Sequence, residues 1–297
     1  MTFDDACKLT NDQAREYLEG LRWGGQPFCA HCGSLEVTKL NGKATRPGVH
    51  KCRACRKQFT VTIGTIFEDS HIEVRKWVMA FCLVCSSKKG ISAHQLYRML
   101  GLGSYKSAWH MAHRIRWALK QEPLKGLLTG VVESDESWVG GRVKAGRKGP
   151  YLENKTAVHA LVQRSGPIAV RAIGRVTAKN LKANLVEFVS KNATLHTDEL
   201  QQYKPIARRF KSHESVNHSE GEYSRDGVHC NTAEAFFALL KRGVHGTFHH
   251  VGKQHLQRYR DEFAFRWNHR KTTDAERTEA ALRLAPGCRL RYCNYGA

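Results

Sequence analysis

The chain has 297 residues, enough for two or three domains, and 48 Lys and Arg against 27 Asp and Glu give it a formal net charge of +21. So large an excess of positive charge predicts a polyanionic partner, with an anionic membrane surface or a ribosomal role as alternatives. The sequence contains no run of about 18 apolar residues, so we predict no membrane span. Ten cysteines, in a chain whose start lacks the apolar core of a secretion signal, predict metal sites or buried thiols in a cytoplasmic protein.

Two cysteine pairs follow a short helix predicted in residues 1–22. Each pair is spaced Cys-x2-Cys, and nineteen residues separate the pairs, a pattern typical of the four-thiolate site of a zinc ribbon. A region this small has little core, so we predict a structural Zn²⁺ that supplies folding free energy to a first domain, residues 1–67. Four incidental cysteines are the alternative. The predicted ligands are Cys29, Cys32, Cys52 and Cys55.

The same region is strongly basic. Residues 37–67 hold seven Lys or Arg and no acid, which suits a surface that faces nucleic-acid phosphates. A solvated basic loop is the alternative. The predicted DNA contacts here are Lys51, Arg53, Arg56 and Lys57.

A helical second domain is predicted over residues 68–125. The string "SAHQLYRMLGLGSYKSAWHMAHRIRWAL" reads as two helices broken at "GLGS", an arrangement typical of a helix-turn-helix. The second helix carries Lys106 and Arg114, which we predict to contact DNA, although many helical hairpins do not bind DNA.

A third domain, residues 126–297, shows mixed periodicity. Its elements are predicted in the order β-β-β-α-β-α-β-α, which implies a mixed sheet with helices packed on it. The predicted segments are strands 131–139, 157–162, 168–173 and 194–197, helices 178–190 and 199–210, a short strand in "HESVNH" and a helix in "TAEAFFALLKRG". The basic insert between the first two strands predicts a hairpin tip that reaches a nucleic-acid backbone, or merely a solvated turn, through Arg142, Lys144, Arg147 and Lys148.

Acidic residues stand where strands would be buried. In "VVESDESWVGG", alternation places Glu133, Asp135 and Ser137 on one face of the first strand. Asp198 ends the fourth strand in "HTDEL", and ligands gather at the carboxyl ends of strands in open sheets. A surface charge is the alternative for each acid, and a helix cap is a further one for Asp198.

The helix in "HCNTAEAFFALLKRG" offers a third carboxylate. At about 100° per residue, Glu234 and Lys241 lie within about 20° of each other beside the apolar stripe, and Asn231 lies about 60° further round. Three clustered carboxylates would hold Mg²⁺ or Mn²⁺, and two such ions stabilise the attacking and leaving oxygens of an in-line phosphoryl displacement.

These motifs together resemble a known family. The cysteine pairs and the strings "VESDESWVGG", "HTDEL", "VNHSEGEY", "HCNTAEAFFALLKRGVHGTFHHV" and "HLQRYRDEFAFRWNHR" are similar to insertion-sequence transposases of the ISXO2-like group. The resemblance implies an α+β, multidomain chain with a ribonuclease-H-like core of DDE type. It implies Asp135 and Asp198 as the first two catalytic acids, with both an Asn and an acid at the start of the helix as candidates for the third. The helix geometry favours Glu234 as the third acid and Mg²⁺ ligand, with Asn231 as the competitor. We expect Lys241 to contact DNA or the reacting phosphate and Glu133 to have a supporting role.

The function that follows is transposition in a bacterial, nucleoid-associated setting. We expect binding of terminal inverted repeats, Mg²⁺-dependent strand cleavage and strand transfer into target DNA, and at least a homodimer, because two DNA ends must be paired. Two alternatives remain: a catalytically inactive zinc-ribbon DNA-binding regulator, and a nuclease of the same fold that cuts hybrid or branched substrates without joining ends.

Overall fold

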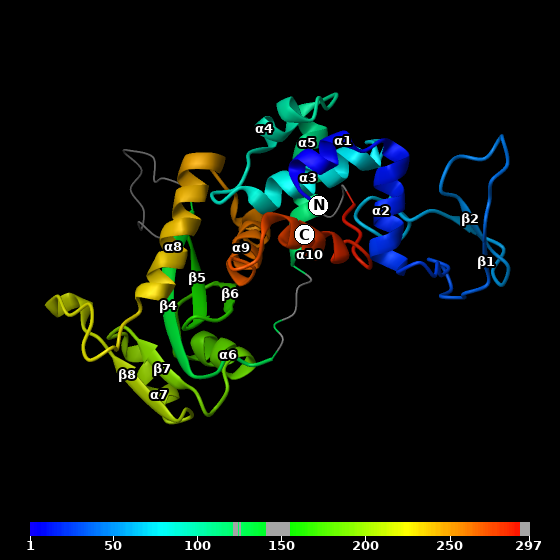
Figure 1. Cartoon of the computed structure of the whole chain (residues 1–297). Helices are drawn as coiled ribbons and strands as arrows, with labels where there is room; N and C mark the ends of the chain where they lie inside the picture. Colours follow the sequence, from blue (N-terminus) through cyan, green and yellow to red (C-terminus); the bar gives the residue numbers. More distant parts are fainter. Residues whose placement is uncertain (121–123, 125, 141–154, 292–297) are drawn as a thin grey trace. The chain divides into compact units, whose positions relative to one another are not determined.

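The computed structural model describes residues 1–120, 124, 126–140 and 155–291 (Figure 1). Its contacts divide the chain into two compact units. Unit 1 combines residues 1–122 with 271–297, and unit 2 comprises residues 123–270. No described helix is long and apolar enough to cross a membrane.

Unit 1 begins with two helices, α1 (Phe3–Lys8) and α2 (Asn11–Trp23), where the sequence predicted one. The break has a local cause, because Thr10 caps a new helix: its side chain accepts a hydrogen bond from the backbone N–H of Gln13, and the side-chain oxygen of Gln13 accepts one from the backbone N–H of Thr10. A small antiparallel sheet follows, in the order β1 (Val37–Lys39), β2 (His50–Cys52) and β3 (Gln58–Phe59).

Three further helices of unit 1 follow the ribbon: α3 (Val74–Ser86), α4 (Ala93–Met99) and α5 (Tyr105–Leu119). The side chains of Ser92 and Ser104 cap α4 and α5, and Gly101 takes the positive φ of 53° that the intervening turn requires. The two predicted helices and their glycine turn are therefore present.

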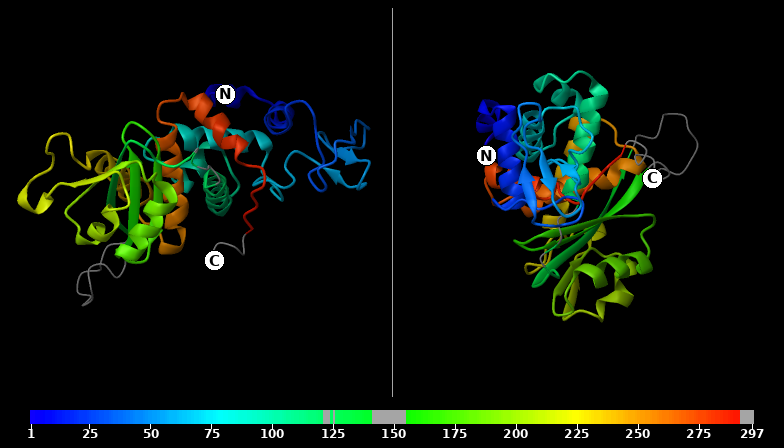
Figure 2. Two further views of the ribbon diagram at one scale, coloured as in Figure 1. Left: turned by 90° about the horizontal axis from the view of Figure 1, so that it is seen from below. Right: turned by 90° about the vertical axis from the view of Figure 1, so that its right-hand side faces the viewer.

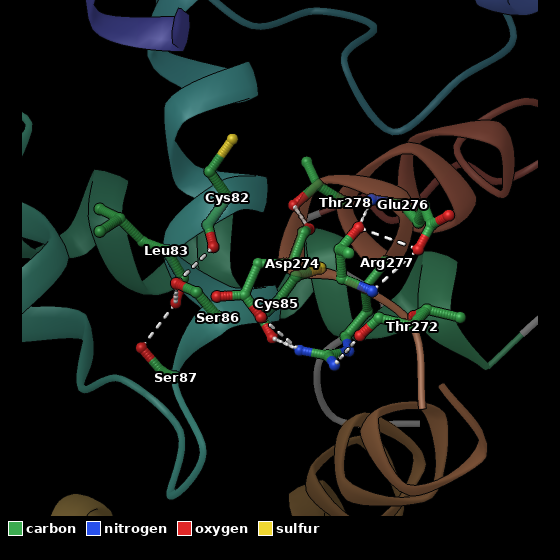
Figure 3. Close-up of polar contacts among 11 residues, drawn as sticks. Cys82, Leu83, Cys85, Ser86, Ser87, Thr272, Asp274, Glu276, Arg277 and Thr278 are labelled. Atoms are coloured by element: carbon green, nitrogen blue, oxygen red, sulfur yellow. Dashed lines mark hydrogen bonds and ion pairs between the residues drawn. The ribbon is translucent and has the colours of Figure 1, made fainter. Parts of the chain in front are cut away.

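The C-terminal helix α10 (Asp274–Arg283) belongs to unit 1, although the sequence analysis placed it in the catalytic domain. Figure 3 shows the reason: the Arg277 guanidinium donates to the carbonyl of Cys85 at the end of α3, at 3.1 Å, and to that of Thr272 at 3.0 Å. The predicted domains 1–67 and 68–125 also fall together in this unit.

Unit 2 is built on a five-stranded sheet in the order β6-β5-β4-β7-β8. The strands β4, β5 and β6 pair antiparallel, whereas β7 and β8 add to β4 in parallel. The predicted mixed sheet is confirmed, and its strands follow the predicted order along the chain. The strands are β4 (Val131–Gly140), β5 (Lys155–Gln163), β6 (Ile168–Ile173), β7 (Thr194–Thr197) and β8 (Ser212–Ser215).

Helices pack on both faces of this sheet (Figures 1 and 2). One core lies between the sheet and α6 (Ala178–Phe188), and it includes Val132 of β4. The other lies under α8 (Asn231–Gly243) and α9 (Lys253–Asn268), and it includes Val139. Odd-numbered side chains of β4 therefore face α8 and even-numbered ones face α6.

The predicted helix 199–210 forms only a 3₁₀ turn, η1 (Gln201–Tyr203), and one α-turn, α7 (Lys204–Ala207). Pro205 stands in the first turn of α7, where its missing N–H costs nothing, and it prevents a continuous helix through this position. The remaining short elements are η2 (His218–Glu220) and η3 (Val244–Phe248).

Candidate active site and cysteine cluster

Three carboxylates meet at the centre of the sheet in unit 2. Single oxygens of Asp135, Glu136 and Asp198 all lie within 4.8 Å of one another. The strand register explains the meeting, because Glu133 of β4 pairs with His196 of the parallel strand β7. Asp135 follows two residues later within β4, and Asp198 follows directly after the last residue of β7, Thr197. The structure thus brings together the first two acids that the sequence singled out.

Glu136 is the member that sequence reasoning missed. Alternation assigns it to the opposite face of β4 from Asp135, and its carboxylate accepts a hydrogen bond from the hydroxyl of Tyr203 on the α6 side. Its oxygen nevertheless reaches the cluster. Its position directly after Asp135 was the one signal in the sequence that could have indicated it. Strict alternation argues against such a neighbour, because it places the next side chain on the opposite face of the strand.

Burial perturbs all three acids, and repulsion within the cluster adds to it for Asp135 and Glu136. Loss of solvent, followed by the charge of Asp198 and then Glu234, raises the pKa of Asp135 to about 7. Loss of solvent also raises the pKa of Glu136 to about 8, with smaller contributions from Asp198 and Asp135, and that of Asp198 above its usual value. The cluster therefore resists full ionisation unless a cation offsets its charge.

Glu133 is fully buried and anchors the start of α8. The residue at the helix N-cap, Cys230, has no side-chain hydrogen bond to the helix. Glu133 supplies the cap from β4 instead: it accepts from the backbone N–H of Thr232 at 2.7 Å and of Ala233 at 3.1 Å. A buried carboxylate is stabilised by these donors and by the helix dipole, so Glu133 fixes α8 against the strand that carries Asp135.

Arg164 of unit 2 extends this anchor. Its Nε donates to Glu133 at 3.1 Å, and its Nη1 donates to the carbonyl of Gly227 at 2.9 Å. Its Nη2 faces Nδ1 of His196 at 3.2 Å and of His229 at 3.3 Å. Because a guanidinium only donates, both ring nitrogens act as acceptors here.

The other predicted residues of α8 surround the cluster without joining it. Among the described residues, the clustered acids do not include Glu234, whose side chain is 46% exposed and lies 3.8 Å from Nδ1 of His218. The carboxylate of Glu234 raises the pKa of Asp135 and the ammonium of Lys241 lowers it, so both charges act on that acid. Asn231 is exposed at the first position of α8.

The four predicted zinc ligands also come together. The Sγ atoms of Cys29 and Cys55 lie 3.6 Å apart, and those of Cys32 and Cys52 lie 3.7 Å apart. A tetrahedron with Zn–S bonds of about 2.3 Å has edges of about 3.8 Å, so the spacing fits one Zn²⁺. Backbone N–H groups of His31 and Cys55 point at Sγ of Cys29 and Cys52, each at 3.4 Å, as suits thiolates that hold a metal.

The predicted DNA contacts of the ribbon lie on its surface. All four side chains are exposed: Lys51, Arg53, Arg56 and Lys57. The four basic residues of the predicted hairpin tip, Arg142, Lys144, Arg147 and Lys148, lie outside the described residues.

The two predicted contacts on α5 differ. Lys106 is exposed in the first turn. Arg114 instead donates to the carbonyl of Glu68 at 2.8 Å and to that of Leu290 at 3.2 Å. Its guanidinium therefore ties segments of unit 1 together, and its contact with DNA stays a prediction.

Family models account for both parts of this arrangement. An ISXO2-like transposase domain matches residues 127–268, and a transposase zinc-ribbon domain matches residues 9–58. The matched segments together span well over half of the chain and contain the carboxylate cluster and the four cysteines. The chain is therefore a DDE-type transposase of an insertion sequence. It belongs to the ISXO2-like family.

One known protein and two solved structures are also similar to this chain. An uncharacterized protein in transposable element ISH50 of Halobacterium salinarum is 26% identical over 274 residues, which cover 87% of this chain and 91% of that protein. A Mos1 strand transfer complex is 12% identical with a TM-score of 0.24, covering 66% of this chain and 77% of that one. A pre-cleavage Mos1 transpososome is 13% identical with a TM-score of 0.28, covering 94% of each chain. The assignment rests on the family models, since these TM-scores are too low to add to it.

Proposed function

We propose that this transposase cleaves DNA at the ends of its insertion sequence and joins the freed ends to target DNA, with Mg²⁺ or Mn²⁺ held by Asp135 and Asp198. The observation that carries the proposal is the meeting of three carboxylate oxygens within 4.8 Å. Glu136 is the third oxygen donor of this cluster, and Glu234 is the acid that approaches from α8, with Asn231 as its competitor for the third catalytic position.

The residues present fit a hard divalent cation. All three donors are carboxylate oxygens, the type that Mg²⁺ and Mn²⁺ prefer. Their pKa values are raised above all by loss of solvent, and a bound cation would favour the ionised carboxylates that metal binding needs. When bound, such a cation stabilises the charge that develops on the attacking and leaving oxygens of an in-line phosphoryl displacement.

The chain's own residues supply the rest of the mechanism. Glu133 holds α8 in register with β4, so that Lys241 stands where its ammonium already acts on Asp135. We assign Lys241 to the scissile phosphate or the adjacent DNA backbone, where a cation stabilises the charge of the transition state. Positioning and electrostatic stabilisation carry most of phosphoryl transfer, so no covalent intermediate with the protein is required.

DNA binding is assigned mainly to unit 1. The exposed Lys51, Arg53, Arg56 and Lys57 surround a ribbon that Zn²⁺ would hold rigid, and Lys106 adds a charge on α5. We infer that this surface binds the terminal inverted repeats. Pairing of two ends requires at least a homodimer.

The test is a cleavage and strand-transfer assay on terminal-repeat DNA in Mg²⁺. Wild-type protein is expected to nick at the repeat boundary and to yield joined products. Asp135→Asn and Asp198→Asn are expected to lose both products while binding the same DNA, because both residues belong to unit 2 and the proposed DNA contacts belong to unit 1. Equal cleavage by the wild type and Asp135→Asn would remove the proposed site, and cleavage without joining would favour the nuclease alternative.

A further inference from the structure

A buried chain of hydrogen bonds leads from the α6 side of the sheet to Glu136. The hydroxyl of Tyr203 donates to Glu136 and lies 2.8 Å from Oγ of Ser134. Ser134 in turn lies 2.8 Å from Nε2 of His159, whose Nδ1 is 3.0 Å from Nδ2 of Asn184. Ser134, His159, Asn184 and Tyr203 are each at most 3% exposed.

The donor and acceptor of each hydrogen bond in this series can be assigned by starting from Arg171, at the end away from Glu136. Arg171 carries only donors and lies 3.4 Å from Oδ1 of Asn184, so the amide nitrogen of Asn184 is left to face His159. Nδ1 of His159 must then accept, which places its proton on Nε2 and directs that proton to Ser134. Arg171 is itself held by Glu187 through two contacts of 2.7 Å.

The inner end follows by the same reasoning. With Nε2 of His159 donating to it, Ser134 has its own hydrogen left for the oxygen of Tyr203. Tyr203 then has only one direction left for its hydrogen, toward Glu136. Each hydrogen in this series therefore points toward Glu136, and the Glu136 oxygen that faces Tyr203 acts as an acceptor.

We propose that Tyr203 is a positioning residue: its hydroxyl donates a hydrogen bond that holds the Glu136 carboxylate as an oxygen ligand of the divalent-metal site. This inference rests on the proposed function, since it concerns the same cluster. A buried hydroxyl that donates to one carboxylate oxygen fixes the rotamer of the carboxylate and leaves its other lone pairs for a cation. This explains how a residue on the α6 side of β4 reaches a cluster whose first member, Asp135, faces α8.

The test compares Mn²⁺ binding by full-length Tyr203→Phe and wild-type protein, measured by electron paramagnetic resonance of free Mn²⁺ at one fixed pH. The variant removes one oxygen and keeps the ring, and the dissociation constant is expected to rise about tenfold or more. Tyr259→Phe is the matched control, because Tyr259 is buried in the core on the opposite face and should leave Mn²⁺ affinity unchanged. Ser134→Ala, one link further out, is expected to weaken binding in the same direction but less.

A double variant separates positioning from general loosening of the fold. In a Glu136→Gln background, Tyr203→Phe should cause no further loss of Mn²⁺ affinity. An unchanged Mn²⁺ dissociation constant in both Tyr203→Phe and Ser134→Ala would overturn the inference. It would also be overturned if Tyr203→Phe weakened Mn²⁺ binding as much in the Glu136→Gln background as in the wild type. Either result would leave the proposed function standing if Asp135→Asn still abolished Mn²⁺ binding, whereas no binding by the wild type would refute the proposed function itself.

Discussion

Replacement of Asp135 by Asn should make the metal-free protein more stable at alkaline pH. The pKa of Asp135 is raised from 3.8 to about 7, so its charged form is disfavoured in the folded protein. Stability from such a group is fully present below the unfolded pKa of about 4 and is lost as the pH rises through the folded value of about 7. Metal-free wild type should therefore lose stability from about pH 4 to about pH 8.

The size of this effect follows from the shift. A difference of about three pKa units corresponds to at most about 4 kcal/mol. Unit 2 comprises residues 123–270, a size at which each kcal/mol moves the melting temperature by about 2–4 °C. Asp135→Asn should thus melt up to about 8–16 °C above metal-free wild type near pH 8, and close to it near pH 4.

Scanning calorimetry of the unit 2 transition, with and without Mg²⁺, is the assay. Mg²⁺ should raise the melting temperature of the wild type at pH 8 and have little effect on Asp135→Asn, because the cation offsets the same charge that the substitution removes. Asp226→Asn makes the same chemical change at an exposed position and should behave as wild type. Identical pH and Mg²⁺ responses in wild type and Asp135→Asn would refute this reasoning.

Three further predictions concern other parts of the chain. Glu133→Ala should destabilise unit 2 by about 3–5 kcal/mol, because it removes the α8 cap and leaves Arg164 without its carboxylate; a calorimetric loss below about 1 kcal/mol would contradict the anchoring role. Cys29→Ser should lower Zn²⁺ content and open residues 1–67 to proteolysis while Mn²⁺ binding by unit 2 persists; retained zinc would be the contrary result. The double variant Lys51→Ala/Arg53→Ala should reduce the slope of the logarithm of the DNA-binding constant against the logarithm of salt concentration by about 1 for each charge that contacts phosphate. Lys179→Ala, which removes an exposed charge in unit 2, is the control, and an unchanged slope in the double variant would exclude these contacts.

Strand order made part of the site predictable. Once 131–139 and 194–197 are recognised as neighbouring parallel strands, Asp135 and Asp198 must end close together, and the register of β4 with β7 places them so. The cysteine spacing predicted the thiolate cluster for an equally local reason, since each Cys-x2-Cys turn sets its own two sulfurs.

Other features depend on contacts that sequence periodicity does not encode. Glu136 lies on the wrong face by alternation, yet its oxygen joins the cluster and accepts a hydrogen bond from Tyr203, 67 residues away. Arg114 has the charge and helical position of a DNA contact, but the carbonyls of Glu68 and Leu290 engage it. The attachment of α10 to α3 likewise depends on Arg277 meeting a distant helix end.

Anomalous diffraction from crystals grown with Mn²⁺ tests the central claim most directly. We predict a manganese peak bonded to carboxylate oxygens of Asp135 and Asp198, at about the 2.0–2.2 Å expected for a small hard cation. A protein that cleaves its terminal repeats in Mn²⁺ yet shows no manganese at these two side chains would contradict the account.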